Sequence, residues 1–193
     1  MGRPREFDAR EALDQAMQVF WARGYEAASL TDLTKAMGIS RSSLYEAFGG
    51  KRDLYLSALA HYDETRVSRV VRRLEGDGPL RARIASVLSD VIDAAVEEGR
   101  RSGCFLCNAA VEVAPHDAGL AARVSDGLDR MEAAYRRALL DARNRGEIPE
   151  DRDPRALARF LVSSVNGLQV TAKVQPDRER LGEVARVIQS VLN

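Results

Sequence analysis

Several hydrogen-bonding side chains follow one another in the segment GISRSSLYEAF, residues 38–48. Arg41 can present a planar fork of N–H donors, and the serine hydroxyls that follow can donate or accept. Arg41, Ser42 and Tyr45 are one and four positions apart, so on a helix they share one face. Small side chains such as Ser42 and Ser43 would let that helix approach a DNA base edge closely, where an arginine fork matches guanine. These residue types at this spacing predict a DNA-reading surface.

A lysine shortly after this segment could hold phosphate. Lys51 opens the next predicted helix beside the backbone N–H groups of residues 49–51, and helix N-termini attract phosphate. Taken singly, the serines could merely cap a helix and Lys51 could be a solvated charge. Because these residues occur together in one short unit of helices, we favour the interpretation that they contact DNA.

The elements that must position these side chains are three predicted helices. The first has an apolar stripe at i, i+3, i+4, i+7 and i+8, formed by Leu13, Ala16, Met17, Phe20 and Trp21. Asp8 followed by Glu11 predicts its capping box and Gly24 its end. The second helix opens at Ser29, with Asp32 three residues later.

A tight glycine turn separates the second predicted helix from the third. Gly38 ends the second helix, and Ser40 caps the third, in which Leu44, Ala47 and Phe48 are expected to face inward. Two short helices joined in this way and held by a longer preceding helix form a helix-turn-helix unit.

Helical periodicity continues to the end of the chain, and no alternating strand pattern of useful length occurs. The further predicted helices are 51–74, 80–98, 104–114, 117–145, 154–174 and 178–192, with Gly- and Pro-rich breaks between them. The sequence therefore predicts an all-α fold of about nine helices. A helix-turn-helix domain over residues 1–50 precedes a second helical domain over 51–193, and the helix 51–74 links the two.

Composition gives no global sign of a nucleic-acid or membrane partner. The 193 residues are 45% hydrophobic and 30% charged, with a formal net charge of +0. No apolar run approaches the ~18 residues of a membrane span. The start MGRPREFD does not resemble a signal peptide. We therefore expect a cytoplasmic protein without a membrane partner.

The N-terminal third resembles the DNA-binding domain of the TetR family of bacterial transcription regulators. The resemblance covers roughly residues 3–60 and rests on GRPREFD and on AMQVFWARGYEAASLTDLTKAMGISRSSLYEAFGGKRDLYLSAL. It implies a fold of about nine helices, with a three-helix head and a linking fourth helix. It also implies that residues 51–193 form a regulatory and dimerisation domain, which dimerises through its last two helices. It implies base or backbone contacts for Thr31, Arg41, Ser42 and Ser43, phosphate contacts for Ser29, Tyr45 and Lys51, and a minor-groove arm carrying Arg3 and Arg5.

The last two predicted helices, 154–174 and 178–192, have apolar positions beyond one buried stripe. Small residues at Ser163, Ser164 and Gly167 would let a symmetry-related helix approach closely. We interpret these helices as an isologous four-helix dimer interface, although they could instead cover only the monomer core. A dimer would read a palindrome with its recognition helices ~34–36 Å apart or a multiple of that distance.

A sensing pocket is expected between the fourth and eighth helices. Its candidate lining residues are Tyr62, Phe105, Asn108, Glu112, Met131, Tyr135 and Phe160. Asn108 and Glu112, four apart on one helical face, could orient a polar ligand group, or could bond each other or a neighbouring helix. The surrounding GCFLCNAAVE resembles the opening of the sixth helix in one large group of TetR regulators, which does not identify a ligand.

Cys104 and Cys107 make no disulfide framework. Three apart on a helix, their Cβ atoms would lie ~5–6 Å apart, too far for a disulfide without unwinding. A single reactive thiol is possible at Cys104, where Arg100, Arg101 and the helix dipole would lower its pKa. The alternative is that both cysteines are small buried helix residues.

The sequence favours neither an enzyme nor a metal site. Cys104 and His116 lie about 18 Å apart along a helix, too far to act as nucleophile and base. No cofactor-binding motif or metal-ligand spacing occurs. The leading hypothesis is a homodimeric, ligand-responsive repressor released from a palindromic operator by a small-molecule effector, and the alternative is a redox or electrophile sensor acting through Cys104 or Cys107.

Overall fold

The computed structural model describes residues 7–96 and 102–193, and all regular structure in these ranges is helical. The helices are α1 (Ala9–Arg23), α2 (Leu30–Met37), α3 (Arg41–Phe48), α4 (Lys51–Tyr62), α5 (Ser68–Glu75), α6 (Leu80–Val96), α7 (Phe105–Glu112), α8 (Ala118–Asn144), α9 (Pro154–Val174) and α10 (Arg178–Ser190). A π-helical turn, η1 (Asp63–Val67), joins α4 to α5. Counting α4, η1 and α5 as one, the described residues form nine helices, which confirms the predicted all-α class.

The head begins and ends its helices where local capping chemistry predicts. Asp8 caps α1 by accepting from the backbone N–H groups of Arg10 and Glu11, but the structure records no reciprocal bond from the Glu11 side chain. Ser29 and Asp32 form the complete capping box of α2. Gly38 ends α2 at φ +67°, a left-handed conformation that glycine adopts without a Cβ penalty.

The α4–η1–α5 segment differs from the single α-helix predicted over 51–74. Ala58 and Tyr62 are buried at ordinary helical spacing, but the next buried apolar residue is Val67, five positions after Tyr62. An α-helix would bring residue 65 or 66 to the buried face, whereas a wider π turn brings Val67 there. The hydroxyls of Thr65 and Ser68 donate to the carbonyls of residues 61 and 63, which satisfies backbone groups within the irregular turn.

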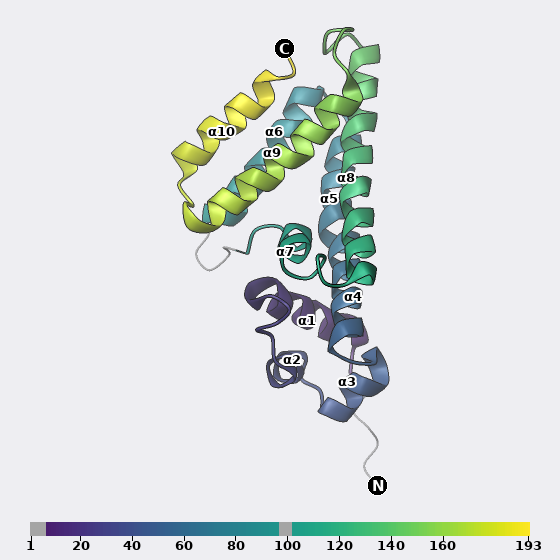
Figure 1. Ribbon diagram of the computed structural model, residues 1–193. Coiled ribbons are helices and arrows are strands. Elements are labelled where there is room, and N and C mark those ends of the chain that lie inside the picture. The colour runs from purple at the N-terminus through teal and green to yellow at the C-terminus, as the bar shows by residue number, and fades with distance from the viewer. Residues whose placement is uncertain (1–6, 97–101) are drawn as a thin grey trace.

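The long α8 lies beside the α4–α5 segment and forms the upright axis of the molecule (Figure 1). Helix α9 crosses α8, α6 packs behind α9, and α10 packs on α6 and α9 at the outer side. The head (α1–α3) lies at the opposite end from the C-terminus, and α7 lies between head and body (Figure 1).

One hydrophobic core runs through both parts. It includes Met17 and Phe20 of α1, Tyr55 of α4, Phe105 of α7 and Leu161 of α9. Tyr55 packs edge-on against Phe20 and against Phe105, so its ring joins the head to α7. Because the core is continuous, the division of the chain at residue 50 stays a prediction.

The end of the helix predicted over 80–98 falls partly outside the described residues. Ala47, expected to face inward, is exposed, while Leu44 is fully buried. Among the helices described, none is both long and apolar enough to cross a membrane.

Candidate DNA interface and effector cavity

Helix α3 presents a polar, solvent-exposed first turn. Ser40 accepts from the backbone N–H of Ser43, and its hydroxyl also lies 2.8 Å from that of Ser42 and 2.9 Å from that of Ser43. This hydroxyl cluster fixes the turn from which Arg41 and Ser42 extend into solvent. Tyr45, one turn later, is 47% exposed although it is aromatic. Leu44 anchors the opposite face of α3 in the core, so α3 has the orientation that a recognition helix requires.

The predicted phosphate-binding groups lie near the starts of α2 and α4. Thr31 is exposed in the first turn of α2, but the Ser29 hydroxyl already donates to the Asp32 carboxylate at 2.7 Å. Lys51 donates to the Glu26 carbonyl at 3.2 Å and its ammonium lies 4.6 Å from the centroid of the Tyr25 ring. A lysine ammonium has three donors, so this contact orients Lys51 and leaves donors for a phosphate. The predicted contacts of Ser29, Thr31, Arg41, Ser42, Ser43, Tyr45 and Lys51 remain predictions, and Arg3 and Arg5 lie outside the described residues.

Helix α7 is bonded directly to the head through Glu112. One Glu112 oxygen accepts from the backbone N–H of Tyr25 and the other from that of Glu26, both at 2.9 Å. The carboxylate lies so close to Gly24 that a Cβ there would meet it at 2.7 Å. Glu112 was predicted from sequence as a ligand group, but its two oxygens are occupied by the loop between α1 and α2.

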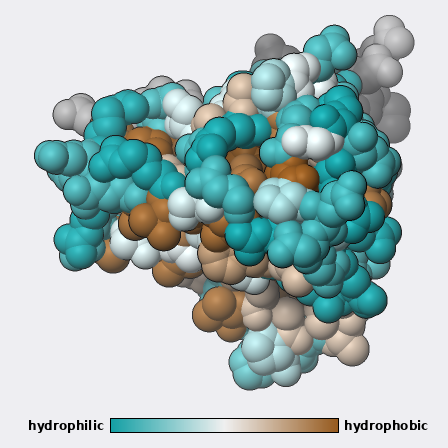
Figure 2. Space-filling view, turned by 90° about the horizontal axis from the view of Figure 1, so that it is seen from above, coloured by the Kyte–Doolittle hydropathy of each residue, from teal (hydrophilic) through white to brown (hydrophobic). Residues whose placement is uncertain are grey.

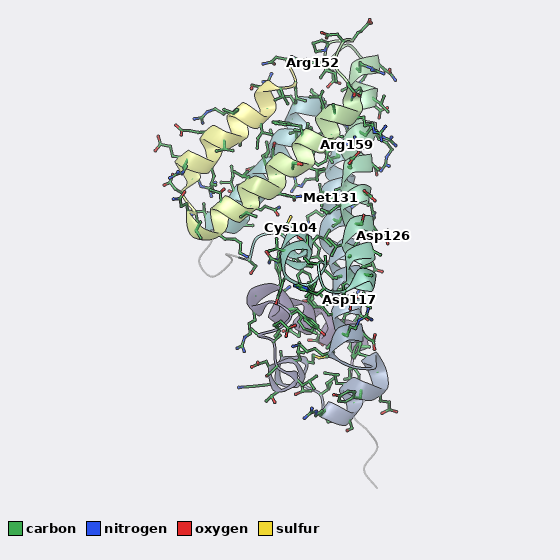
Figure 3. All side chains as sticks on the ribbon, viewed as in Figure 1. Cys104, Asp117, Asp126, Met131, Arg152 and Arg159 are labelled. Atoms are coloured by element: carbon green, nitrogen blue, oxygen red, sulfur yellow. The ribbon has the colours of Figure 1, made fainter. Side chains whose placement is uncertain are left out.

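Two other contacts lie at this end of the body, one between α4 and α8 and one between α1 and the segment before α7. Arg52 of α4 forms a bidentate pair with Asp117, the N-cap of α8, at 2.6 and 2.8 Å. Figure 3 shows Asp117 at the head end of α8. The Arg52 hydrogen bonds, followed by the backbone N–H of Leu120, hold the pKa of the Asp117 carboxyl well below its usual range. Trp21 donates its indole N–H to the Gly103 carbonyl at 3.0 Å.

A cavity of about 90 Å³ lies in the body, between the α4–η1–α5 segment, α6, α8 and α9. Three predicted ligand groups line it: Tyr62, Met131 and Tyr135. Cys104 also lines it, from the start of α7, and Figure 3 shows it below Met131 of α8. The cavity therefore lies between the predicted fourth helix (51–74) and the predicted eighth helix (154–174, here α9), and its role as a sensing pocket stays a prediction.

The other four predicted ligand groups do not line this cavity. Phe105 is buried between the rings of Tyr55 and Tyr62. Asn108 donates to the Ser102 carbonyl and accepts from Lys173, and Glu112 binds the head. Phe160 is 44% exposed on the outer face of α9. Sequence reasoning missed three polar lining residues, Arg66, Asn166 and Gln169, because polar positions on amphipathic helices are ordinarily assigned to the solvent face. It named Cys104 as a possible sensor but did not place it in the cavity wall.

Cys104 is the N-cap of α7 in an extended conformation, rather than a residue within the helix. Its Sγ lies 3.8 Å from the Tyr62 hydroxyl, which donates to it. The pKa of the Cys104 thiol is lowered, chiefly by its side-chain hydrogen bond with Cys107, although burial alone would raise it. Arg100 and Arg101, to which the sequence analysis assigned that effect, lie outside the described residues. No group of three or more His, Cys, Asp or Glu within residues 7–96 and 102–193 could hold a metal ion.

A helix-turn-helix head on a larger helical body is an arrangement typical of DNA-binding regulators, and sequence comparison identifies the family. Residues 12–58 match the bacterial regulatory proteins of the tetR family, and residues 80–188 match the tetracyclin repressor-like C-terminal domain. The chain belongs to the TetR family, and it is a DNA-binding transcription regulator.

Individual relatives agree with this assignment. The chain is 40% identical over the full length of both proteins to YezE of Bacillus subtilis, an uncharacterised HTH-type transcriptional regulator. It is 29% identical to the HTH-type transcriptional repressor ComR of Escherichia coli, over 95% of this chain and 88% of that protein. A cysteine-substituted variant of the TetR family regulator CifR, solved with 26-bp double-strand operator DNA, superposes with a TM-score of 0.89 at 34% identity over 99% of this chain and 100% of that one.

Proposed function

We propose that this regulator is a homodimeric repressor that leaves a palindromic operator when a small-molecule effector enters the cavity. The observation that carries the proposal is the position of α7. Cys104 at its start lines the cavity, and Glu112 at its end binds two backbone N–H groups of the head. A change of shape at the cavity can therefore reach the head through one short helix. We expect the protein to be cytoplasmic, where it would have access to its DNA operator.

An exposed apolar face on the last two helices supports the dimer. On α9, Phe160, Ser163, Gly167, Val170 and Val174 follow one another at spacings of three and four and are all exposed. Val184 and Val187 of α10 continue the pattern at 42% and 67% exposure. A seam of period 3.5 is typical of helices that pack against partner helices. Viewed from above, hydrophobic surface appears in patches between hydrophilic groups (Figure 2).

The expected mechanism is a change in the separation of the two heads. Effector binding would shift the α4–η1–α5 segment and α7 together. The segment and Cys104, the N-cap of α7, line the cavity, while Lys51 of α4 and Glu112 of α7 each bond the loop between α1 and α2. A coupling of ~1–3 kcal/mol would change DNA affinity ~5–150-fold. The Arg52–Asp117 pair and the Glu112 contacts are the bonds that such a shift must strain or break.

The test is binding of the purified protein to the DNA immediately upstream of its own coding region. We expect protection of a palindrome and an affinity that falls steeply as salt rises, because phosphate contacts release counterions. Equal binding to a scrambled fragment would contradict autoregulation, and a genome-wide search for bound sites would then test the regulator function itself. A small molecule that binds the cavity without changing DNA affinity would be excluded as an effector.

A second candidate is a redox or electrophile sensor acting through Cys104 or Cys107. It is favoured by the lowered pKa of the buried Cys104 thiol beside the Tyr62 hydroxyl. Replacing both cysteines by serine should abolish any response to oxidants or electrophiles while operator binding persists. A response that survives in the double variant would exclude both thiols as the sensor.

A further inference from the structure

The cavity between α5, α6, α8 and α9 contains buried polar groups that nothing in the described part of the chain satisfies. Tyr135 is 2% exposed, and its hydroxyl has no hydrogen-bond partner there. Arg66 Nε and Gln169 Oε1 are also buried without a hydrogen-bond partner in the described part of the chain, and both residues line the same cavity. Buried polar atoms are normally paired, so three unpaired atoms around one small space indicate a binding site.

The charge of the cavity is positive. No carboxylate within the described residues lies at salt-bridge distance from Arg66, whose guanidinium carbon lies 5.8 Å from the centroid of the Trp21 ring. Asp63, three residues earlier, is already paired with Arg123 at 3.2 Å and Arg130 at 3.0 Å. A cation lining a mostly apolar space is best satisfied by an anion that also accepts hydrogen bonds.

The remaining groups define the shape of that anion. Burial raises the pKa of Tyr135, so its hydroxyl stays protonated and can donate to an acceptor. Gln169 Oε1 is an acceptor and would take a hydroxyl proton from the ligand. Valines of α5, α6 and α9 form much of the rest of the wall and suit a short alkyl chain. At about 90 Å³ the space equals roughly three water volumes of ~30 Å³ each, far below the ~300–1,000 Å³ of a drug-sized site.

We propose that the effector is a short-chain aliphatic carboxylate, held by Arg66 and Tyr135, with a hydroxyl group on the chain bound by Gln169. The inference rests on the proposed effector-responsive function and names the ligand class for that same cavity. It excludes large hydrophobic effectors and neutral isosteres of the acid.

The probes are propionate, lactate and the neutral amide propionamide, titrated into the full-length protein at pH 7 by calorimetry and thermal melting, with sodium chloride as the ionic control. We expect propionate to bind and raise the melting temperature, lactate to bind more tightly than propionate, and propionamide to bind at least about tenfold more weakly. Propionamide binding as tightly as propionate, or no binding of either acid in the millimolar range, would overturn the proposal.

Two variants test the assigned groups. Tyr135→Phe removes one unpaired buried hydroxyl, so without ligand it should melt at or above the wild-type temperature, yet bind propionate roughly tenfold more weakly. Arg66→Gln should lose binding more fully, whereas Arg69→Gln, an exposed arginine of α5, should bind as the wild type does. Wild-type affinity in Tyr135→Phe and Arg66→Gln would overturn the assignment.

Operator binding measured in the same samples separates this inference from the proposed function. Specific DNA binding without acid binding would overturn the ligand class alone. Acid binding that leaves DNA affinity unchanged would overturn the acid as effector.

Discussion

At the scale of single residues, Arg41 is the side chain on which base reading depends. It is exposed in the first turn of α3, and the structure records no ion pair for it within the described residues. We expect Arg41→Ala to weaken operator binding about 10–100-fold and to remove the preference at one base pair, because a bidentate guanine contact contributes about 1–3 kcal/mol of discrimination. Fluorescence anisotropy with the operator and its single-base variants measures both effects.

The control for this prediction is Arg69→Ala, which removes an exposed arginine from α5 in the body. It should leave operator affinity unchanged. An equal loss of affinity for operator and scrambled DNA in Arg41→Ala would indicate that Arg41 binds phosphate rather than a base.

Lys51 should behave differently from Arg41. The Glu26 carbonyl and the Tyr25 ring hold its ammonium at the start of α4. We expect Lys51→Ala to weaken binding to all sequences alike and to reduce the slope of log K against log salt by about 1, since one phosphate contact is lost. If the variant melts earlier but keeps the wild-type salt slope, Lys51 only supports the fold of the head.

The residues that the sequence predicts well are those whose partners are close along the chain. Ser29 and Ser40 cap helices through residues three positions later, and local spacing reveals this. The partners of Glu112 could not be predicted in this way, because the N–H groups of Tyr25 and Glu26 lie 87 and 86 residues away. Side chains that bond distant backbone leave no periodic signal in a sequence.

At the scale of elements, α7 connects the body to the head through the two hydrogen bonds that Glu112 accepts, and a substitution of one atom can remove one of them. Glu112→Gln keeps the size of the side chain but replaces one accepting oxygen by a donor, so one of the two backbone N–H groups loses its partner. We expect a loss of about 1–3 kcal/mol of stability and a smaller effect of effector on DNA affinity. Thermal melting and operator titrations with and without effector measure the two quantities.

Glu64→Gln is the matched control, because Glu64 is exposed and forms no ion pair within the described residues. It should change neither quantity. A Glu112→Gln variant that is less stable but shows full effector response would mean that α7 holds the head without transmitting the signal.

The contact between α4 and α8 should depend on pH. Arg52 lowers the pKa of Asp117, so the native state favours the ionised carboxylate more than the unfolded chain does. The resulting stability is present above the unfolded value of about 3.9 and is lost as pH falls toward the lowered native pKa. Asp117→Asn keeps an N-cap for α8 but removes the charge, so we expect its melting temperature to approach that of the wild type as pH falls from 5 to about 2.

Asp126→Asn, a substitution of an exposed aspartate of α8, is the control and should follow the wild type throughout this range. A constant difference between wild type and Asp117→Asn at every pH would assign the effect to capping rather than to the pair with Arg52.

Helix caps and apolar periodicity predict most element boundaries. They predict a single α-helix over 51–74, however, and not the π turn at Asp63–Val67. The buried positions shift by one residue between Tyr62 and Val67. That shift can be absorbed by a wider turn or by a break in the helix, and the choice depends on packing against α8. Asp63 in this turn pairs with Arg123 and Arg130 of α8, contacts that only the folded structure reveals.

At the scale of the whole molecule, the predicted dimer would cover the exposed apolar seam of α9 and α10. We expect Val187→Glu to give a folded monomer, because Val187 is 67% exposed and a carboxylate buried in an interface without a partner is costly. Light scattering coupled to gel filtration gives the oligomeric state, and circular dichroism checks that the chain remains helical.

The same variant tests whether the operator is read by two heads at once. One head makes only half of the contacts, so a monomer should protect no palindrome and should bind DNA far more weakly at equal salt. Val111→Glu is the control: Val111 is 81% exposed on α7, outside the seam, and the variant should remain a dimer with wild-type affinity. If Val187→Glu stays dimeric, the interface does not depend on this part of α10. If it is monomeric but protects the full palindrome, the heads assemble on DNA and the seam is not required for recognition.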